Sequence, residues 1–145
     1  MPENNNAGAM RAWLRACPAL TRDRAFGADY LAEGESYSLD TIPSAIRYRE
    51  NILGETAPLE RQEQVFVLAS REPYGPDHTQ NLDNLGVFQD VAAWIVAQNA
   101  ARRFPEWAGG EVVAVVPTVS AAPVSRGSAF ARYEMEITVT YRVGN

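Results

Sequence analysis

The sequence of 145 residues predicts an α+β domain, in which an N-terminal helix and one long helix pack on a mainly antiparallel (mixed) β-sheet. Apolar residues recur every three or four positions in two segments, as on the buried face of a helix. In a third segment, near the C-terminus, apolar and polar residues alternate, as along a half-buried strand. Length and the lack of repeats favour a single domain, 1–145, with residues 1–6 expected to be flexible.

The first helix is predicted after a run of asparagines, which are candidate N-caps. Four apolar residues then share one helix face: Met10, Trp13, Leu14 and Cys17. Pro18 is expected to end this helix. Free cysteines are among the most buried residues, so Cys17 is interpreted as a small hydrophobic residue of the core.

Several strands are predicted between the two helices. Residues 26–31 and 36–42 are short extended candidates. Residues 44–51 and 60–71 are expected to form two antiparallel strands joined by a longer loop. Residues 65–69 are apolar on both faces of a strand, so this strand is expected inside the sheet with other groups packed on each side.

The long helix is predicted between residues 85 and 99. Its apolar face is formed by Leu85, Phe88, Val91, Ala92 and Ile95. The candidate N-caps are Asp77, Thr79 and Asn81. Arg102 and Arg103 favour the C-terminal dipole, and Pro105 is expected to stop the helix.

Two strands are predicted after this helix, at residues 111–119 and 129–143. In the second, alternate residues from Ala131 to Val143 are expected on a dry face, and those from Arg132 to Arg142 on a wet face. The predicted core between the long helix and the sheet consists of Val67, Leu68, Phe88, Ile95, Ile137 and Val139.

Composition excludes several classes of partner. The formal charge of −5 and pI near 4.9 oppose long-range attraction to a phosphate backbone, so no sequence-specific nucleic acid is expected. No apolar run approaches the roughly 20 residues that span a bilayer, so no membrane is expected. One cysteine and one histidine exclude an internal disulfide and a zinc site of the usual spacing. Use in a reducing cytoplasm, or in a particle assembled there, is predicted.

No arrangement of residues predicts catalysis, so the chain is expected not to be an enzyme and to use no cofactor and no metal. The only histidine, His78, has no visible nucleophile beside it and is interpreted as a polar residue near a helix N-terminus. Asp77, Asp83 and Asp90 are explained by the dipole of the long helix. Neither a phosphate-binding loop nor a dinucleotide fingerprint is present.

One long segment carries a resemblance to a known family. The sequence "VFVLASREPYGPDHTQNLDNLGVFQDVAAWI", with "LRACPAL", "DYL", "YSLDTIPS" and "ARYEMEITVTYR" around it, resembles minor capsid or minor tail proteins of tailed bacteriophages and prophages. The match extends over residues 12–142, and these relatives look like tail terminators. Some of them carry the name chloramphenicol resistance protein. The paired-histidine motif of that acetyltransferase is absent from this chain, so that name looks like an error.

The resemblance implies a tail-terminator-like fold and a hexameric ring that caps the finished tail tube and joins it to the head. The implied partners are further copies of this chain, the major tail tube protein and head–tail connector proteins, and the implied location is the virion tail. A monomer in solution is compatible with this role. Other classes left open are a head–tail connector or adaptor, a small-molecule binding module and an acetyltransferase-type enzyme.

A ring requires two different surfaces on each subunit, and two groups of residues are candidates. One is the "REPYG" loop, with Arg71, Glu72 and Tyr74, and the other is a polar strand face, with Arg132, Glu134, Glu136 and Arg142. Reversal of Arg71 and Arg132 to Glu is expected to leave the monomer melting temperature nearly unchanged. The alternative is an ordinary loop and a solvated sheet face.

Overall fold

The computed structural model describes residues 5–21, 23–29, 31, 34–76, 78–119, 125–126 and 129–143. In chain order the elements are α1 (Asn6–Leu14), β1 (Ala25–Ala28), β2 (Ser36–Thr41), β3 (Tyr48–Glu50), β4 (Thr56–Pro58), β5 (Arg61–Pro73), α2 (His78–Ala101), β6 (Gly110–Val119), β7 (Ser125–Arg126) and β8 (Phe130–Val143). The predicted α+β class, with an N-terminal helix and one long helix, is confirmed.

The main sheet has the strand order β1-β2-β5-β8-β6, with β7 paired to one end of β8. Only the short edge pair β1–β2 is parallel, and the other pairs are antiparallel. β5 lies between β2 and β8, as expected for a strand that is apolar on both faces. Its ladder with β8 runs from Arg61 opposite Arg142 to Pro73 opposite Phe130. This long antiparallel pair forms the centre of the sheet.

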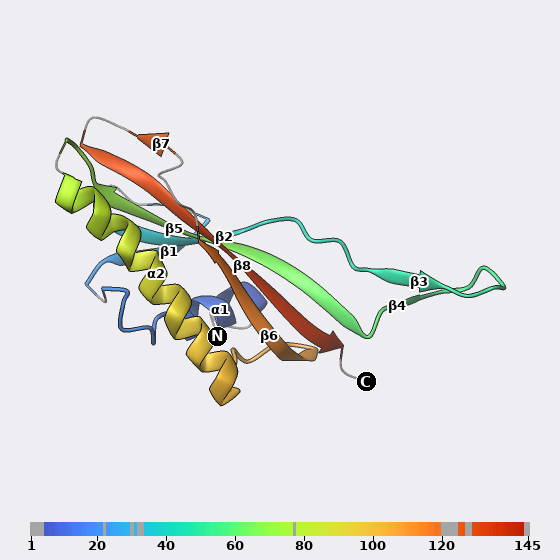
Figure 1. The fold of residues 1–145 in the computed structure, drawn as a ribbon. Coiled ribbons are helices and arrows are strands. Elements are labelled where there is room, and N and C mark those ends of the chain that lie inside the picture. The colour runs from blue at the N-terminus through green and yellow to red at the C-terminus, as the bar shows by residue number, and fades with distance from the viewer. Residues whose placement is uncertain are drawn as a thin grey trace.

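Both helices contribute to a single core on one face of the sheet (Figure 1). α1 supplies Met10 and Leu14, and α2 supplies Phe88, Val91 and Ile95. The sheet side of this core includes Leu39, Phe66, Leu68, Tyr133, Met135, Ile137 and Val139. Five of the six predicted core residues therefore lie where the sequence pattern placed them. The apolar positions of β8 form its dry face as predicted, except that Val143 is exposed.

Val67 is the exception among the predicted core residues. It is buried, at 9% exposure, but it does not belong to the core cluster between the helices and the sheet. Its neighbours Phe66 and Leu68 both belong to that cluster. Successive side chains of a strand point to opposite faces, so Val67 faces the side away from the helices.

The helix boundaries differ from the predicted ones. Asn5 caps α1, since its Oδ1 accepts a hydrogen bond of 2.7 Å from the Gly8 N–H, but α1 ends at Leu14 and Cys17 is buried in the turn after it. Of the segment predicted to be flexible, residues 1–4 lie outside the described residues. α2 begins at His78, so Thr79 and Asn81 lie within the helix and are not its N-cap, while Asp77 lies outside the described residues.

α2 ends in a C-cap in which one residue adopts a left-handed backbone conformation. Arg102 has a φ of 56°, in the left-handed region. The Arg103 N–H donates to the Gln98 carbonyl over 2.9 Å, which is the long bond of a Schellman motif. Arg102 takes the position where glycine is most common, and Pro105 prevents the helix from continuing.

The predicted pairing of residues 44–51 with 60–71 is wrong. β3 pairs instead with β4, inside the segment expected to be a loop, with Arg49 opposite Ala57. A tight turn at residues 51–55 closes this hairpin locally, and closing a short loop costs less entropy than closing a long one. β5 pairs with β2 and β8, which offer it much longer ladders.

Candidate subunit interface

Side chains on the polar face of β8 form ion pairs within the chain. The Arg132 guanidinium donates to Asp40 on β2 over 2.6 Å and to Glu134 over 2.8 Å. Because β5 lies between β8 and β2, the Arg132 side chain reaches across β5. Partial burial alone would lower the pKa of Arg132, but the hydrogen bonds to Asp40 and Glu134 raise the pKa above its ordinary value. Arg132 therefore links β8 to β2 across β5, and reversing its charge is expected to lower the stability of the chain.

The residues predicted for the "REPYG" loop do not form one surface. β5 continues to Pro73, so Arg71 and Glu72 lie on a strand and face opposite sides of the sheet. The Arg71 guanidinium lies 5.1 Å from the centre of the Phe130 ring. Tyr74 is half-buried against the core, and its N–H donates to the Ala129 carbonyl over 2.9 Å.

Glu72 is buried in an ion pair within the chain. Its side chain is 4% exposed and accepts a hydrogen bond of 2.6 Å from Arg24. Arg24 also binds Glu35 over 2.8 Å and lies over the Tyr37 ring. Burial alone would lower the pKa of Arg24, but the hydrogen bond and charge of Glu72 raise it. Glu72 is thus occupied in holding the segment before β1 against β5.

The two predicted groups also lie closer together than expected. Arg71 and Arg132 are directly opposite each other in the β5–β8 ladder, so they belong to one face of one sheet. Two such residues do not supply the two separate surfaces that a ring contact requires. Glu136 is exposed on the same face, and Arg142 pairs with Glu60 over 3.2 Å at the far end of β8. Their part in an interface stays a prediction.

The edge strand β6 is capped by a side chain of α2. The Asn99 amide donates to the Val115 carbonyl over 2.7 Å, and its Oδ1 accepts from the Val115 N–H over 2.9 Å. Asn99 thus binds the backbone as a neighbouring strand would. A register shift between Val112 and Ala114 and the missing N–H of Pro117 further disrupt this edge. Such features protect edge strands from pairing with other chains.

The opposite edge is also engaged by a helix. β1 is short, and the Arg11 Nε of α1 donates to the Phe26 carbonyl over 2.7 Å. The Arg11 guanidinium lies 5.6 Å from the centre of the Phe26 ring. In the described part of the chain, β1 and β6, which end the strand order β1-β2-β5-β8-β6, therefore each carry a helix side chain on their backbone. Association through a continuous sheet is disfavoured at both edges.

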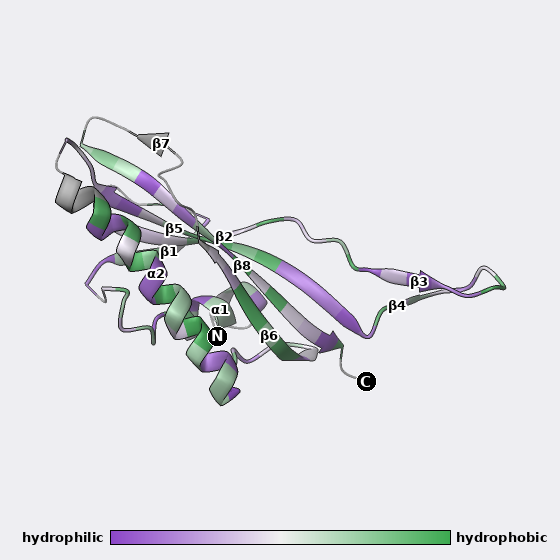
Figure 2. Ribbon diagram, viewed as in Figure 1, coloured by the Kyte–Doolittle hydropathy of each residue, from purple (hydrophilic) through white to green (hydrophobic). Residues whose placement is uncertain are grey.

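Residues 42–60, here called the arm, project far from the rest of the molecule (Figure 1). The arm consists of β3, β4 and the extended segments that join them to β2 and β5. Figure 2 colours the ribbon by hydropathy and shows both hydrophilic and hydrophobic stretches along the arm. Several of its apolar side chains are exposed: Ile42, Ile46, Tyr48, Ile52 and Leu53. Ile52 is 101% exposed and Leu53 78%. An isolated two-stranded hairpin is at best marginally stable in water, so an exposed apolar arm indicates a contact surface.

The tip of the arm is held by its own hydrogen bonds. Asn51 Oδ1 accepts from the N–H groups of Leu53 and Glu55, over 2.9 and 3.0 Å. The Asn51 N–H donates to the Glu55 carbonyl over 2.9 Å, and Gly54 adopts a φ of 81° that favours glycine. The loop is therefore preorganised, and it presents Ile52 and Leu53 to the outside.

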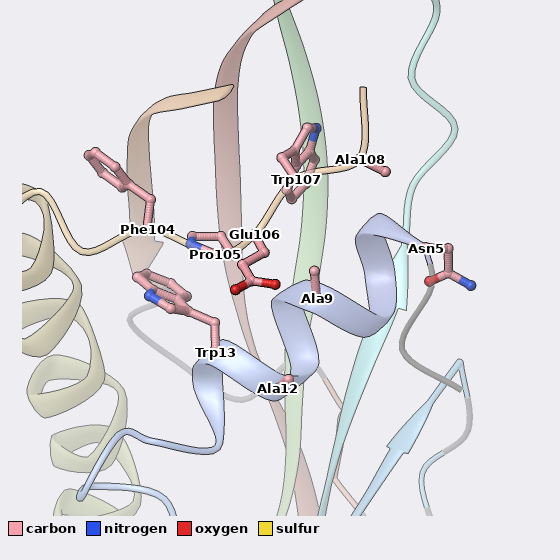
Figure 3. Close-up of a pocket in the computed structure, with 9 residues that line it drawn as sticks. All are labelled: Asn5, Ala9, Ala12, Trp13, Phe104, Pro105, Glu106, Trp107 and Ala108. Atoms are coloured by element: carbon pink, nitrogen blue, oxygen red, sulfur yellow. The ribbon is translucent and has the colours of Figure 1, made fainter. Parts of the chain in front are cut away.

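A groove of about 550 Å³ lies between α1 and residues 104–108 (Figure 3). It is lined by Asn5, Ala9, Ala12, Trp13, Phe104, Pro105, Glu106, Trp107 and Ala108. Two contacts fix its walls. The Trp13 Nε1 donates to the Arg103 carbonyl over 3.1 Å, and the Ala108 N–H donates to Asn6 Oδ1 over 2.9 Å. Alanines on α1 leave space opposite aromatic rings, so the groove suits an apolar side chain.

The arm and the groove were both missed by sequence reasoning. A signal for the arm was present, because the apolar pair Ile52 and Leu53 lies between the turn formers Asn51 and Gly54. The groove has no comparable local signal, since its two walls are about 90 residues apart in the chain, as in the Trp13 to Arg103 contact.

Among the described residues there is no group of three or more His, Cys, Asp or Glu side chains that could hold a metal ion. No helix in this part of the chain is long and apolar enough to cross a membrane. Burial raises the pKa of the Cys17 thiol above its ordinary value, which disfavours the nucleophilic thiolate.

Comparison with known proteins assigns no family. No protein-family model matches the chain, and no curated protein matches it. The resemblance to terminator-like minor tail proteins therefore stays a prediction, and the structure contributes the arm, the capped edges and the groove to any functional proposal.

Proposed function

We propose that this chain is a structural subunit of a tailed bacteriophage or prophage, and that it acts as the tail terminator. In this role it forms a hexameric ring on the finished tail tube and joins the tube to the head connector. The observation that carries the proposal is the arm, which presents exposed apolar residues on a preorganised tip outside the body. Projecting elements of this kind bind neighbouring subunits.

The capped sheet edges support the same role. A terminator has to bind a growing tube without continuing its growth. Asn99 of α2 binds backbone groups of β6, and Arg11 of α1 binds the Phe26 carbonyl of β1, so these groups are not available to an added strand. A subunit of this design associates through its arm and its side-chain surfaces, so assembly can close on itself and does not extend as an open sheet.

A head–tail connector or adaptor is the second candidate. Three arginines at the base of the arm favour it, because Arg47, Arg49 and Arg61 line a second hollow of about 610 Å³. An acidic surface of a connector ring would complement these guanidinium groups. The two roles predict different particles when the chain is absent: tails of abnormal length for a terminator, and tails of normal length that do not join heads for a connector.

Electron microscopy of particles made without this chain tests the proposal. Loss of a terminator is expected to give tails of abnormal, extended length that do not join heads. Tails of normal length that remain separate from filled heads would favour the connector role. Infectious particles of normal appearance would contradict both. Re-supply of the wild-type chain, compared with an arm variant in which Ile52 and Leu53 are changed to Glu, serves as the matched control.

A further inference from the structure

We propose that the arm tip of one copy docks in the aromatic groove of a second copy, with Ile52 and Leu53 against Trp13 and Phe104. The inference rests on the proposed ring-forming function and specifies the contact that such a ring would use. It joins two features that otherwise have no partner in the described part of the chain: the exposed apolar pair Ile52 and Leu53 at the arm tip, and a groove lined mostly by aromatic rings and alanines, with Glu106 among them.

The arm tip loses little conformational entropy on docking. The Asn51 side chain holds the turn through two backbone hydrogen bonds, and its amide also donates to Glu55 over 3.0 Å. Side chains presented by a preorganised loop pay less ordering entropy when they bind. Ile52 and Leu53 are therefore suited to act as anchors of an interface.

The groove is complementary to such an anchor. Trp13 is fixed by its bond to the Arg103 carbonyl and by the ring of Trp94, whose centre is 4.9 Å away. Ala9 and Ala12 contribute only methyl groups to the α1 wall of the groove, and Figure 3 shows the Glu106 carboxylate between Trp13 and Ala9. The volume of about 550 Å³ is within the range of sites that enclose small apolar groups.

Charge favours a second copy as the occupant. Glu50 and Glu55 flank the tip, whereas Arg102 and Arg103 directly precede the groove segment 104–108. The Arg102 guanidinium lies 5.9 Å from the centre of the Phe104 ring, which places a positive charge at the rim of the groove. Glu106 lines the groove and its carboxylate would repel Glu50 and Glu55, so the attraction depends on Arg102 at the rim. Opposite charges around an apolar centre set the register of an interface.

The contact has to form between copies. Figure 1 shows the arm tip well separated from α1, which forms one wall of the groove. The arm tip and the groove are different surfaces. Each copy therefore inserts its arm tip into one neighbour and accepts the arm tip of another neighbour in its groove. Such heterologous contacts build closed rings when the rotation between copies closes.

Disulfide trapping between variants that each carry one added cysteine tests the contact. The chain has no lysine, so amine-directed cross-linkers have little to act on, and its one native cysteine is buried. Leu53→Cys is mixed with Ala12→Cys under oxidising conditions at about 1 mM protein, where weak contacts are populated. A mixed disulfide is expected. The matched control replaces Ala12→Cys with Val116→Cys, an exposed position on β6 outside the groove.

Sedimentation of charge and tip variants provides a second readout. Ile52→Glu with Leu53→Glu is expected to weaken association at least about tenfold, whereas Leu82→Glu, at an exposed position of α2, leaves it unchanged. Glu50→Arg and Arg102→Glu are each expected to weaken association, and the two variants mixed together are expected to restore it. Glu55 is left intact because its carboxylate binds Asn51.

Equal trapping at Ala12 and Val116, or no trapping at about 1 mM, overturns the contact. So does a tip variant that associates and terminates tails as the wild type does. In that case the chain still acts in tails, and only the contact is wrong. Trapping at Ala12 in a chain whose loss leaves tails normal would instead retain the contact and refute the terminator role.

Discussion

The side-chain amide of Asn99 forms two hydrogen bonds with the backbone of Val115, over 2.7 and 2.9 Å, and thereby completes the edge of the sheet. Asn99 also donates to the Ile95 carbonyl over 2.8 Å, so it connects the last turns of α2 to β6. This single residue joins the helix to the strand and closes the strand to other chains.

Asn99→Leu is expected to lower the free energy of unfolding by about 1–3 kcal/mol, because it leaves the N–H and carbonyl of Val115 without their partner. Urea denaturation measures this change. Val96→Ala, at an exposed position one turn earlier, is the control and is expected to change stability by less than about 0.5 kcal/mol. The leucine variant is also expected to aggregate faster, by light scattering, through its open edge. A fully stable, non-aggregating variant would contradict the capping role.

Glu72→Leu is expected to cost about 2–3 kcal/mol of stability. Removing one partner of a fully buried ion pair costs about 3–5 kcal/mol, and the smaller value is expected because Arg24 keeps its bond to Glu35 and is partly exposed. Glu35→Leu, whose side chain is 49% exposed, is expected to cost less than about 1 kcal/mol. Equal effects of the two changes in denaturant unfolding would show that the burial of Glu72 has no energetic role.

Arg132→Glu is expected to lower the melting temperature by about 3–8 °C, which corresponds to roughly 1–2 kcal/mol in a domain of this size. The new carboxylate would lie beside Asp40 and Glu134, where the wild type has two charge-assisted hydrogen bonds. Arg71→Glu loses a contact with the Phe130 ring but no ion pair with a described residue, so it is expected to cost less. Thermal unfolding followed by circular dichroism compares them. An unchanged melting temperature for Arg132→Glu would show that the ion pairs of Arg132 do not stabilise the fold.

Phe88→Ala and Ile137→Ala are each expected to lower the free energy of unfolding by about 2–5 kcal/mol, because both side chains are almost fully buried between α2 and the sheet. Val67→Ala is expected to cost less than about 2 kcal/mol, since fewer atoms are removed and the residue lies outside that core. Chemical denaturation of the three variants measures the order. A cost for Val67→Ala as large as that for Phe88→Ala would show that the second face of the sheet is as tightly packed as the first.

Stability is expected to fall at alkaline pH partly through Cys17. Burial raises the pKa of this thiol in the folded chain, and backbone hydrogen bonds from Ala19 and Leu20 offset that rise only in part. The unfolded thiol ionises near its ordinary pKa of about 8.5. The stability is therefore fully present below about pH 8.5 and is lost as pH rises from there through the higher folded pKa.

Urea unfolding between pH 7 and 10 checks this dependence, with Cys17→Ala as the reference that lacks the thiol. The wild type is expected to lose more stability over this range than the variant does. A thiol reagent should also label Cys17 slowly in the native chain and rapidly in urea. Identical pH profiles, or rapid native labelling, would argue against the buried position.

The sequence by itself determined the elements with a strong period. The alternation from Ala131 to Val143 predicted the dry face of β8, and the spacing of Phe88, Val91 and Ile95 predicted the buried face of α2. These patterns are readable because the direction of a side chain follows from backbone geometry within one element. The same local rule was misapplied at Val67, whose neighbours already occupied the core face.

Tertiary structure alone decided which elements meet. Residues 44–51 were expected to pair with β5, but β3 within them pairs with β4, because a short turn joins β3 to β4 and because β2 and β8 form longer ladders with β5. The residue pattern of a strand does not determine which strand it pairs with. The Asn99–Val115 cap, the Arg24–Glu72 pair and the groove each join residues from separate segments. A solvent-exposed asparagine and a partly buried capping asparagine such as Asn99 look alike in a sequence, because the difference lies in which distant segment of the chain packs against the side chain.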